Sequence, residues 1–153
     1  MADECVIDTV VLQSANASLT KQPRERRYIR RRLRLLARIR NGSLVALISS
    51  RLLDEYWDKV RQPRNQFVRQ FFELVTSPSP APTRCILNWK KRWSGGEREQ
   101  AYRKCRFPKE DEHVLRTAIR NHIKTTIFTE EHRMLKADEC IYRHFRVHIC
   151  EPP

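Results

Sequence analysis

The stretch Cys5-Val6-Ile7-Asp8-Thr9-Val10-Val11-Leu12 lies near the start of this 153-residue chain and decides its fold class. A run this short, apolar and β-branched predicts a strand buried on both faces, as in a parallel sheet. Asp8 is unusual there, because burial of a lone charge is costly. Two interpretations remain open. Either the Asp8 side chain caps the following turn with help from Thr9, or it lies at the carboxyl end of the strand and binds a cation.

The size and composition of the chain predict a single domain, residues 1–153, with one core. No apolar run approaches the roughly 20 residues that a membrane span requires. The acidic start of the chain is unlike the basic start of a secretory signal. The five cysteines include no Cys-x-x-Cys pair, which is typical of a cytosolic protein with reduced thiols. We therefore expect a cytoplasmic protein without membrane contact.

The net charge of +13 is unevenly distributed along the chain. The first 106 residues contain 23 Lys and Arg against 10 Asp and Glu, whereas the last 47 contain eight of each. Such a field attracts polyanions, nucleic acid first and an acidic partner protein second. The alternative is a basic surface that serves only solubility.

A helix predicted over residues 24–40 carries much of this excess. Ile29, Leu33 and Leu36 form its apolar stripe, and nine arginines crowd its other faces. This density destabilises a helix unless an anion offsets it, and guanidinium groups suit phosphate contacts. A second basic segment, residues 84–106, interleaves aromatic residues that either stack on single-stranded RNA or belong to the core. The expected RNA or partner contacts are Arg24, Arg27, Arg31, Arg34, Arg38, Lys90, Lys91 and Arg92.

Strands and helices alternate along the remaining chain. Further strands are predicted at residues 44–48, 125–129 and 145–150. Helices are predicted at residues 51–60, 66–75 and 108–122, with a short helix around Met134 and Leu135 and a loop at 76–83. This alternation predicts an α/β domain with a mostly parallel sheet.

Acidic residues follow the predicted strands or open a helix: Asp8, Glu55, Asp111, Glu112, Glu130 and Glu131. Because the carboxyl ends of parallel strands share one edge of a sheet, these acids are expected to converge. Converging carboxylates cannot all stay ionised without a counter-charge, and oxygen ligands favour Mg²⁺ or Mn²⁺ over Zn²⁺. An acidic metal site on a basic body predicts a metal-dependent nuclease.

With these acids the sequence resembles the PIN-domain family, particularly the bacterial and archaeal PIN-domain toxins of toxin–antitoxin pairs. Val6-Ile7-Asp8-Thr9 is similar to the family's opening Asp-Thr strand, and residues 49–56 are similar to its helix with an active-site Glu. Residues 108–115 with Ala118 are similar to the family's Pro-x-Asp-Asp-x-x-Leu-x-x-Ala. Residues 128–135 are similar to its Thr-x-Asp-x-x-Leu-Leu, and residues 147–152 to its end.

The resemblance implies a three-layer α/β/α fold, a Mg²⁺ or Mn²⁺ site and single-strand ribonuclease activity. It assigns catalytic and metal-binding roles to Asp8, Glu55, Glu112 and Glu131, with Asp111 as a metal ligand through a one-residue shift. It further implies an antitoxin whose segment covers the basic helix and the acidic cleft. Because family toxins are often dimers, a homodimer belongs to the same expectation.

Departures from the family pattern leave other functions open. Val10 stands where the family usually has Asn, and Glu112 and Glu131 stand where it usually has Asp. Because Mg²⁺ demands near-ideal geometry, the main alternative is a weakened or inactive PIN-like module that binds RNA or a partner. A third hypothesis is a DNA-binding regulator that uses the arginine-rich helix.

A competing zinc site would use Cys140, His144, His148 and Cys150. Their spacing is not a standard pair-and-pair pattern, so ordinary packing is expected for these residues.

Overall fold

The computed structural model describes residues 2–17, 23–77, 81, 83–120 and 123–153. It contains a five-stranded sheet with the strand order β3-β2-β1-β4-β5, in which every pairing is parallel. The strands are β1 (Asp3–Ile7), β2 (Leu44–Ile48), β3 (Cys85–Leu87), β4 (Thr125–Phe128) and β5 (Val147–Cys150). Helices flank this sheet in a three-layer α/β/α arrangement, which confirms the predicted fold class.

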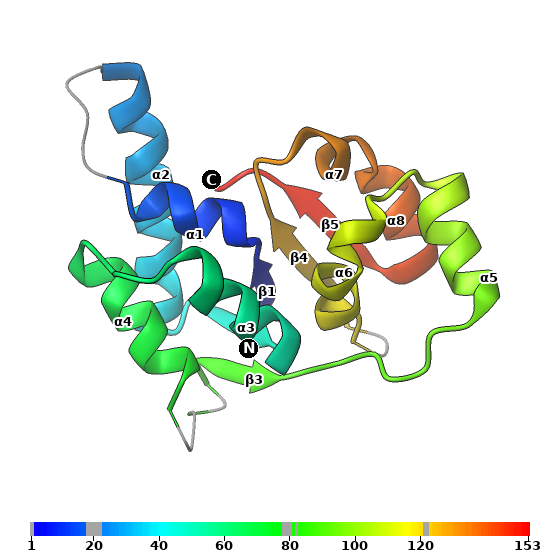
Figure 1. Ribbon diagram of the computed structural model, residues 1–153, viewed down its shortest axis with the longest axis horizontal. Helices are drawn as coiled ribbons and strands as arrows, with labels where there is room; N and C mark the ends of the chain where they lie inside the picture. Colours follow the sequence, from blue (N-terminus) through cyan, green and yellow to red (C-terminus); the bar gives the residue numbers. More distant parts are fainter. Residues whose placement is uncertain (1, 18–22, 78–80, 82, 121–122) are drawn as a thin grey trace.

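Helices occupy the connections between the strands (Figure 1): α1 (Thr9–Ala15), α2 (Pro23–Asn41), α3 (Ser50–Lys59), α4 (Gln66–Val75), α5 (Gly95–Arg98), the π-helix η1 (Glu99–Lys104), the 3₁₀ helix η2 (Lys109–Asp111), α6 (Glu112–Ala118), α7 (His132–Lys136) and α8 (Asp138–Phe145). In Figure 1, α1 to α4 lie to the left of the central strands and α5 to α8 lie to the right. Among the described residues, no helix combines the length and the apolar character of a membrane span.

The burial of Tyr56 and its hydrogen bond to β1 fix the position of α3 beside the carboxyl end of β1. All five residues of β2 are buried, as expected for a parallel strand covered on both faces. Ser49 follows β2 and caps α3, because its hydroxyl accepts a hydrogen bond from the Leu52 amide at 3.2 Å. Tyr56 of α3 is fully buried, and its hydroxyl donates to the Ile7 carbonyl at 2.5 Å. These contacts anchor α3 beside the end of β1.

The first strand is shorter than the sequence predicts. β1 ends at Ile7, and residues 9–15 form α1, in which Val11 and Leu12 are buried. The prediction of a strand that continues to Leu12 is therefore wrong. An apolar run of this length does not distinguish a buried strand from a buried helix. The break after Ile7 places Asp8 at the carboxyl end of the strand.

Other boundaries also differ from the predictions. Residues 138–145 form α8, so the last strand begins at Val147. Arg146 ends α8 in the left-handed conformation with φ 60°, which the sequence does not mark with a glycine. α6 ends at Ala118 rather than His122, and His122 lies outside the described residues. Part of the predicted loop, residues 78–80 and 82, also lies outside them.

A disulfide bond joins Cys105, directly after η1, to Cys140 of α8, with the Cα atoms 5.3 Å apart. The expectation of reduced thiols is therefore wrong for these two cysteines. They are 35 residues apart in the sequence, so no spacing motif connects them. Cys5, Cys85 and Cys150 are free thiols.

Candidate metal centre

The sheet topology defines where a ligand would bind. From β1 the chain proceeds to β2 and β3 on one side, and later to β4 and β5 on the other. Ligands of open α/β sheets bind outside the carboxyl ends of the strands at such a switch point. The register pairs Ile7 of β1 with Phe128 of β4. The next residues, Asp8 and Thr129, therefore lie side by side at this edge.

Asp8 is a buried carboxylate, only 2% exposed. Asp8 is the N-cap residue of α1, but its side chain makes no hydrogen bond of standard capping geometry to that helix. The Thr129 hydroxyl donates to Asp8 Oδ2 at 2.7 Å, and the Asp8 amide donates to the Phe128 carbonyl at 3.0 Å. Burial raises the pKa of Asp8 to about 6, and the charge of Glu55 acts in the same direction. The hydrogen bond from Thr129 partly opposes this rise.

Glu55 extends from α3 to His113 of α6, and the two side chains form a hydrogen bond. This bond is the main reason why the pKa of Glu55 lies below its usual value. His113 is itself buried, and its charge also lowers the pKa of Asp8 and of Asp111. The imidazole therefore lies within electrostatic reach of three carboxylates.

Asp111 closes η2 directly before α6. Burial raises the pKa of Asp111 to about 7, with further contributions from the charges of Asp8, Glu110 and Glu131. Carboxylates that raise one another's pKa lie close in space. We call Asp8, Glu55, Asp111 and Glu131 the acid cluster. Its four members come from the end of β1, α3, η2 and the connection between β4 and α7.

Glu131 and Glu130 follow β4 but have different partners. Glu131 caps α7, because its Oε2 accepts from the Met134 amide at 2.8 Å, while its Oε1 lies 3.1 Å from Arg133 Nε. Glu130 forms an ion pair with Arg32 of α2 at 2.8 Å. Both side chains of this pair are largely buried. The pair joins the arginine-rich helix to the edge of the acid cluster.

The structure does not bring Glu112 into the acid cluster. Its carboxylate accepts a hydrogen bond from the Tyr102 hydroxyl and lies 3.8 Å from Arg98 and 3.6 Å from Arg116. The neighbouring residue Asp111 interacts with Asp8 instead. The structure therefore brings Asp111, rather than Glu112, near Asp8.

The acid cluster contains donor types that hard divalent cations prefer. They are carboxylate oxygens with one imidazole nitrogen nearby, a set that suits Mg²⁺ or Mn²⁺. Among the described residues, no three of these carboxylates have oxygens within 4.8 Å of one another. Mg²⁺ keeps several waters and binds one or two carboxylates directly, which suits this wider spacing. The buried Thr9 hydroxyl, beside Glu55, has no hydrogen-bond partner of standard geometry in the described structure.

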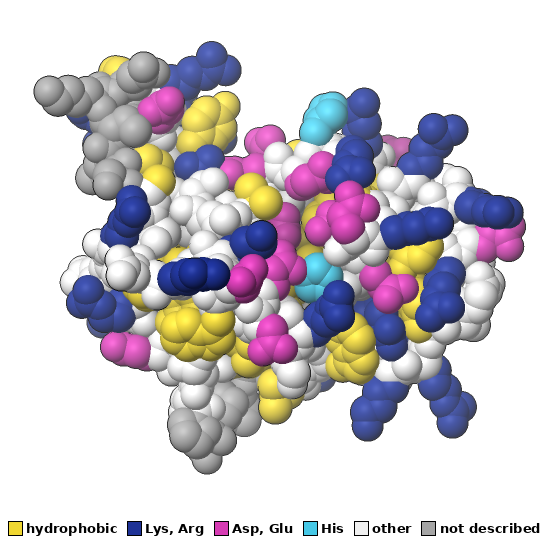
Figure 2. All heavy atoms as spheres, viewed as in Figure 1, with side chains coloured by type: hydrophobic (Ala, Val, Ile, Leu, Met, Phe, Trp, Pro, Cys, Tyr) yellow, Lys and Arg dark blue, Asp and Glu magenta, His cyan; other side chains and the backbone are white. Residues whose placement is uncertain are grey.

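Basic and aromatic side chains surround the acid cluster. Figure 2 shows acidic side chains near the middle of one face, with Lys and Arg on both sides. A groove of about 610 Å³ at the carboxyl ends of β2 and β3 is lined by Arg51, Trp89 and Lys91, among others. Trp93, in contrast, is a core residue that stacks on Phe145 with ring centroids 5.7 Å apart.

The predicted contact residues differ in exposure. Lys90 is half-buried, and its ammonium group lies 3.8 Å from the Glu97 carboxylate. Arg31 is also half-buried and lies near the Tyr28 ring. The other six are exposed: Arg24, Arg27, Arg34, Arg38, Lys91 and Arg92.

Comparisons of this chain with protein-family models, with curated proteins and with solved structures find no match. The chemistry assigned to the acid cluster therefore depends on its own geometry and charge.

Two residues of the site, Thr129 and His113, were not identified from the sequence. Thr129 follows β4 by one residue, just as Asp8 follows β1, so the strand register would have identified it. His113 stands two residues after Asp111, on the first turn of α6. No ligand spacing marks it, because its partner Glu55 is 58 residues away in the sequence.

Proposed function

We propose that this protein is a metal-dependent, single-strand-specific ribonuclease of PIN type, the toxin of a cytoplasmic toxin–antitoxin pair. The observation that carries the proposal is the convergence of Asp8, Glu55, Asp111 and Glu131 at the switch point of the sheet. Burial raises the pKa of Asp8 to about 6 and that of Asp111 to about 7, and the charges of neighbouring carboxylates add to both shifts. Mg²⁺ or Mn²⁺ would supply a counter-charge.

The chain would hold such an ion through Asp8 and Asp111, whose carboxylates have the fewest competing partners in the cluster. When bound, the ion supplies an activated water and stabilises the leaving oxygen of a phosphodiester. Thr129 fixes the orientation of the Asp8 carboxylate through its hydrogen bond. Tyr56 holds α3, and therefore Glu55, against the end of β1.

The surroundings of the acid cluster support single-stranded RNA as the substrate. Exposed arginines on α2 suit phosphate contacts, and the ion pair between Arg32 and Glu130 joins that helix to the cluster. Trp89 and Lys91 in the neighbouring groove offer an aromatic face and a cation, the combination that binds unpaired bases and their phosphates. The same surfaces would bind the acidic segment of an antitoxin. A homodimer belongs to this proposal.

A second candidate function is an inactive PIN-like module that binds RNA or a partner protein. The observation in its favour is that, besides Asp8 with its hydrogen bond from Thr129, two of the four carboxylates already have partners within the protein. Glu55 is bonded to His113, and Glu131 caps α7. In this case the arginine-rich helix would bind its target without cleavage.

Cleavage of end-labelled single-stranded RNA in the presence of Mn²⁺, Mg²⁺ or EDTA tests the proposal. We expect metal-dependent cleavage that Asp8→Asn abolishes and that Asp111→Asn lowers by about a hundredfold or more, a loss of about 2.7 kcal/mol of transition-state stabilisation. Glu112→Gln is the matched control, because Glu112 lies outside the cluster and Gln still accepts the bond from Tyr102. Equal cleavage by the wild type and Asp8→Asn would contradict the proposal. RNA binding without cleavage would favour the inactive module.

A further inference from the structure

A second group of metal-ligand side chains lies between η1 and α8, apart from the acid cluster. Cys105 follows η1, whereas Cys140 and His144 stand four residues apart in α8 and so share one face of that helix. The Sγ atoms of both cysteines and a ring nitrogen of His144 all lie within 4.8 Å of one another. In the part of the chain that the structure describes, this is the one group of three ligands so closely spaced.

We propose that Cys105, Cys140 and His144 bind a zinc ion when the disulfide bond is reduced. Two thiolates and one imidazole are ligands typical of Zn²⁺, and the fourth tetrahedral position is left to water. The site differs from the zinc set considered from the sequence, because Cys105 replaces His148 and Cys150. This inference does not depend on the ribonuclease proposal.

Reduction of the disulfide bond precedes the binding of zinc. A dithiol reductant breaks the S–S bond, becomes a cyclic disulfide itself and leaves the thiols of Cys105 and Cys140. Binding of Zn²⁺ releases one proton from each thiol, while neutral His144 adds a nitrogen ligand without losing a proton. The sulfur atoms then separate to about 3.8 Å, the distance set by two Zn–S bonds of about 2.3 Å in a tetrahedron.

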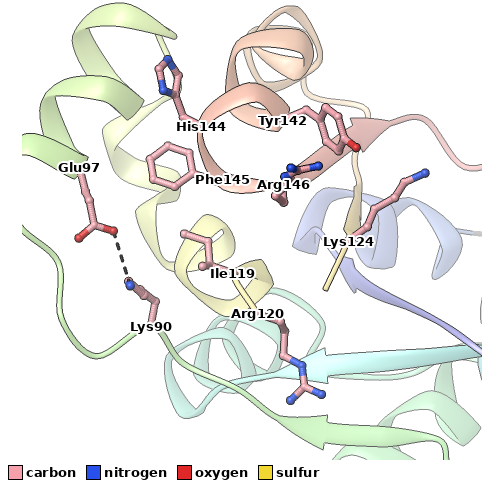
Figure 3. Close-up of a pocket in the computed structure, with 9 residues that line it drawn as sticks. All are labelled: Lys90, Glu97, Ile119, Arg120, Lys124, Tyr142, His144, Phe145 and Arg146. Carbon is pink, nitrogen blue, oxygen red and sulfur yellow. Dashed lines mark ion pairs between the residues drawn. The ribbon is translucent and has the colours of Figure 1, made fainter. Parts of the chain in front are cut away.

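The burial of the three residues suits such a site. Cys105 is buried, Cys140 is half-buried and His144 is exposed. The His144 ring makes an edge contact with Phe145, with ring centroids 6.4 Å apart, and one of its nitrogens is in the ligand group. His144 also lines a pocket of about 420 Å³ together with Lys90 and Glu97, which gives water access to its neighbourhood (Figure 3).

The proposed site would join two elements of the structure. Cys105 directly follows η1, whereas Cys140 and His144 lie in α8. Either a disulfide or a zinc ion would therefore hold η1 to α8. The link between η1 and α8 would then exist under oxidising and under reducing conditions.

Titration of the full-length protein with Co²⁺, under anaerobic conditions after phosphine reduction, tests the site. We expect one equivalent of tetrahedral cobalt with thiolate-to-cobalt charge-transfer absorption, displaced by Zn²⁺. Cys140→Ser should abolish this absorption, and His144→Gln should weaken binding about tenfold or more. Cys150→Ser is the matched control, because Cys150 is a free, exposed thiol outside the group. Absorption that survives Cys140→Ser, or that is lost in Cys150→Ser, would overturn the proposal.

A second measurement uses only the wild-type protein and therefore does not depend on whether the variants fold. Zn²⁺ should raise the melting temperature of the reduced wild-type protein by more than that of the oxidised protein at the same metal concentration, because the acid cluster can bind Zn²⁺ in both forms. Since the acid cluster is present in both forms, the difference isolates the cysteine site. An equal shift in both forms, or no shift in either, would overturn the proposal.

Discussion

At Asp8, burial and hydrogen bonding act in opposite directions. The carboxylate is almost inaccessible, yet the Thr129 hydroxyl is the one side-chain donor that the described structure gives it. The Thr9 amide and the charge of His113 also favour the ionised form, but burial outweighs all three and keeps the pKa of Asp8 raised. Asp8 therefore lowers the stability of the metal-free protein at neutral pH, as expected for a residue positioned to bind a cation.

The Asp8→Asn variant should gain stability relative to the wild type as pH rises. The pKa of Asp8 is raised from 3.8 to about 6 in the folded state, so the folded state binds the proton more tightly and loses stability as pH increases through this range. Asn carries no charge, and its oxygen still accepts from Thr129. We expect the difference in unfolding free energy to grow by about 1–2 kcal/mol from pH 5 to pH 8.

Urea unfolding of both proteins in EDTA at the two pH values measures this difference. The comparison with wild type removes the contributions of titrating groups that Asp8 does not affect, whereas Asp111, whose pKa the charge of Asp8 raises, adds to the difference in the same direction. A difference that is constant or that shrinks with pH would show that the Asp8 carboxylate is not strained by burial.

Tyr56 gives a second prediction for a single residue. Tyr56→Phe removes the hydroxyl that donates to the buried Ile7 carbonyl, and an unpaired buried acceptor costs about 1–3 kcal/mol. Tyr28→Phe, at an exposed position on α2, should change the unfolding free energy by less than about 0.5 kcal/mol. Urea unfolding measures both. Equal effects would contradict the role of Tyr56 in anchoring α3.

Among the elements, those with a long, regular pattern were predicted well. The helix predicted over residues 24–40 is α2, and the apolar run 44–48 is β2. β3 has three residues, too few for a periodic pattern. The start of β5 depends on the left-handed Arg146, which the residue type does not reveal.

The residues of the candidate site also differ in how well the sequence predicts them. Glu55 follows the end of β2, which an apolar run marks, whereas the apolar run that continues to Leu12 does not mark the end of β1 before Asp8. The choice between Asp111 and Glu112 depends on the 3₁₀ turn η2, which changes the direction of successive side chains at the start of α6. His113 could be identified only from its tertiary contact with Glu55.

The exposed face of α2 should contribute to RNA binding through phosphate contacts. Neutralising Arg27 and Arg34 to Gln should reduce the slope of log K against log salt concentration for single-stranded RNA by about 0.7 for each phosphate that the variant no longer neutralises. Arg143→Gln, on the exposed surface of α8, is the control and should leave the slope unchanged. Fluorescence anisotropy over a salt series measures the slopes. An equal change in the control would assign binding to overall charge rather than to α2.

At the scale of the whole molecule, an acidic region and a basic region lie side by side. The parallel sheet brings the acid cluster to one edge, while the basic excess lies in the first two-thirds of the chain. The contact between Arg32 and Glu130 joins the two regions. A polyanion drawn to α2 would thus reach a site that holds a divalent cation.

The most direct test of this account is Mn²⁺ binding followed by thermal unfolding with the disulfide bond intact. At Mn²⁺ about a hundredfold above its Kd, the wild type should gain about 2.7 kcal/mol. Variants of the adjacent residues Asp111 and Glu112 then distinguish binding at the acid cluster from binding outside it. Asp8→Asn and Asp111→Asn should lose this stabilisation, whereas Glu112→Gln should keep it. No stabilisation of the wild type at millimolar Mn²⁺, or its loss in Glu112→Gln alone, would contradict the assignment of the acid cluster as a metal site.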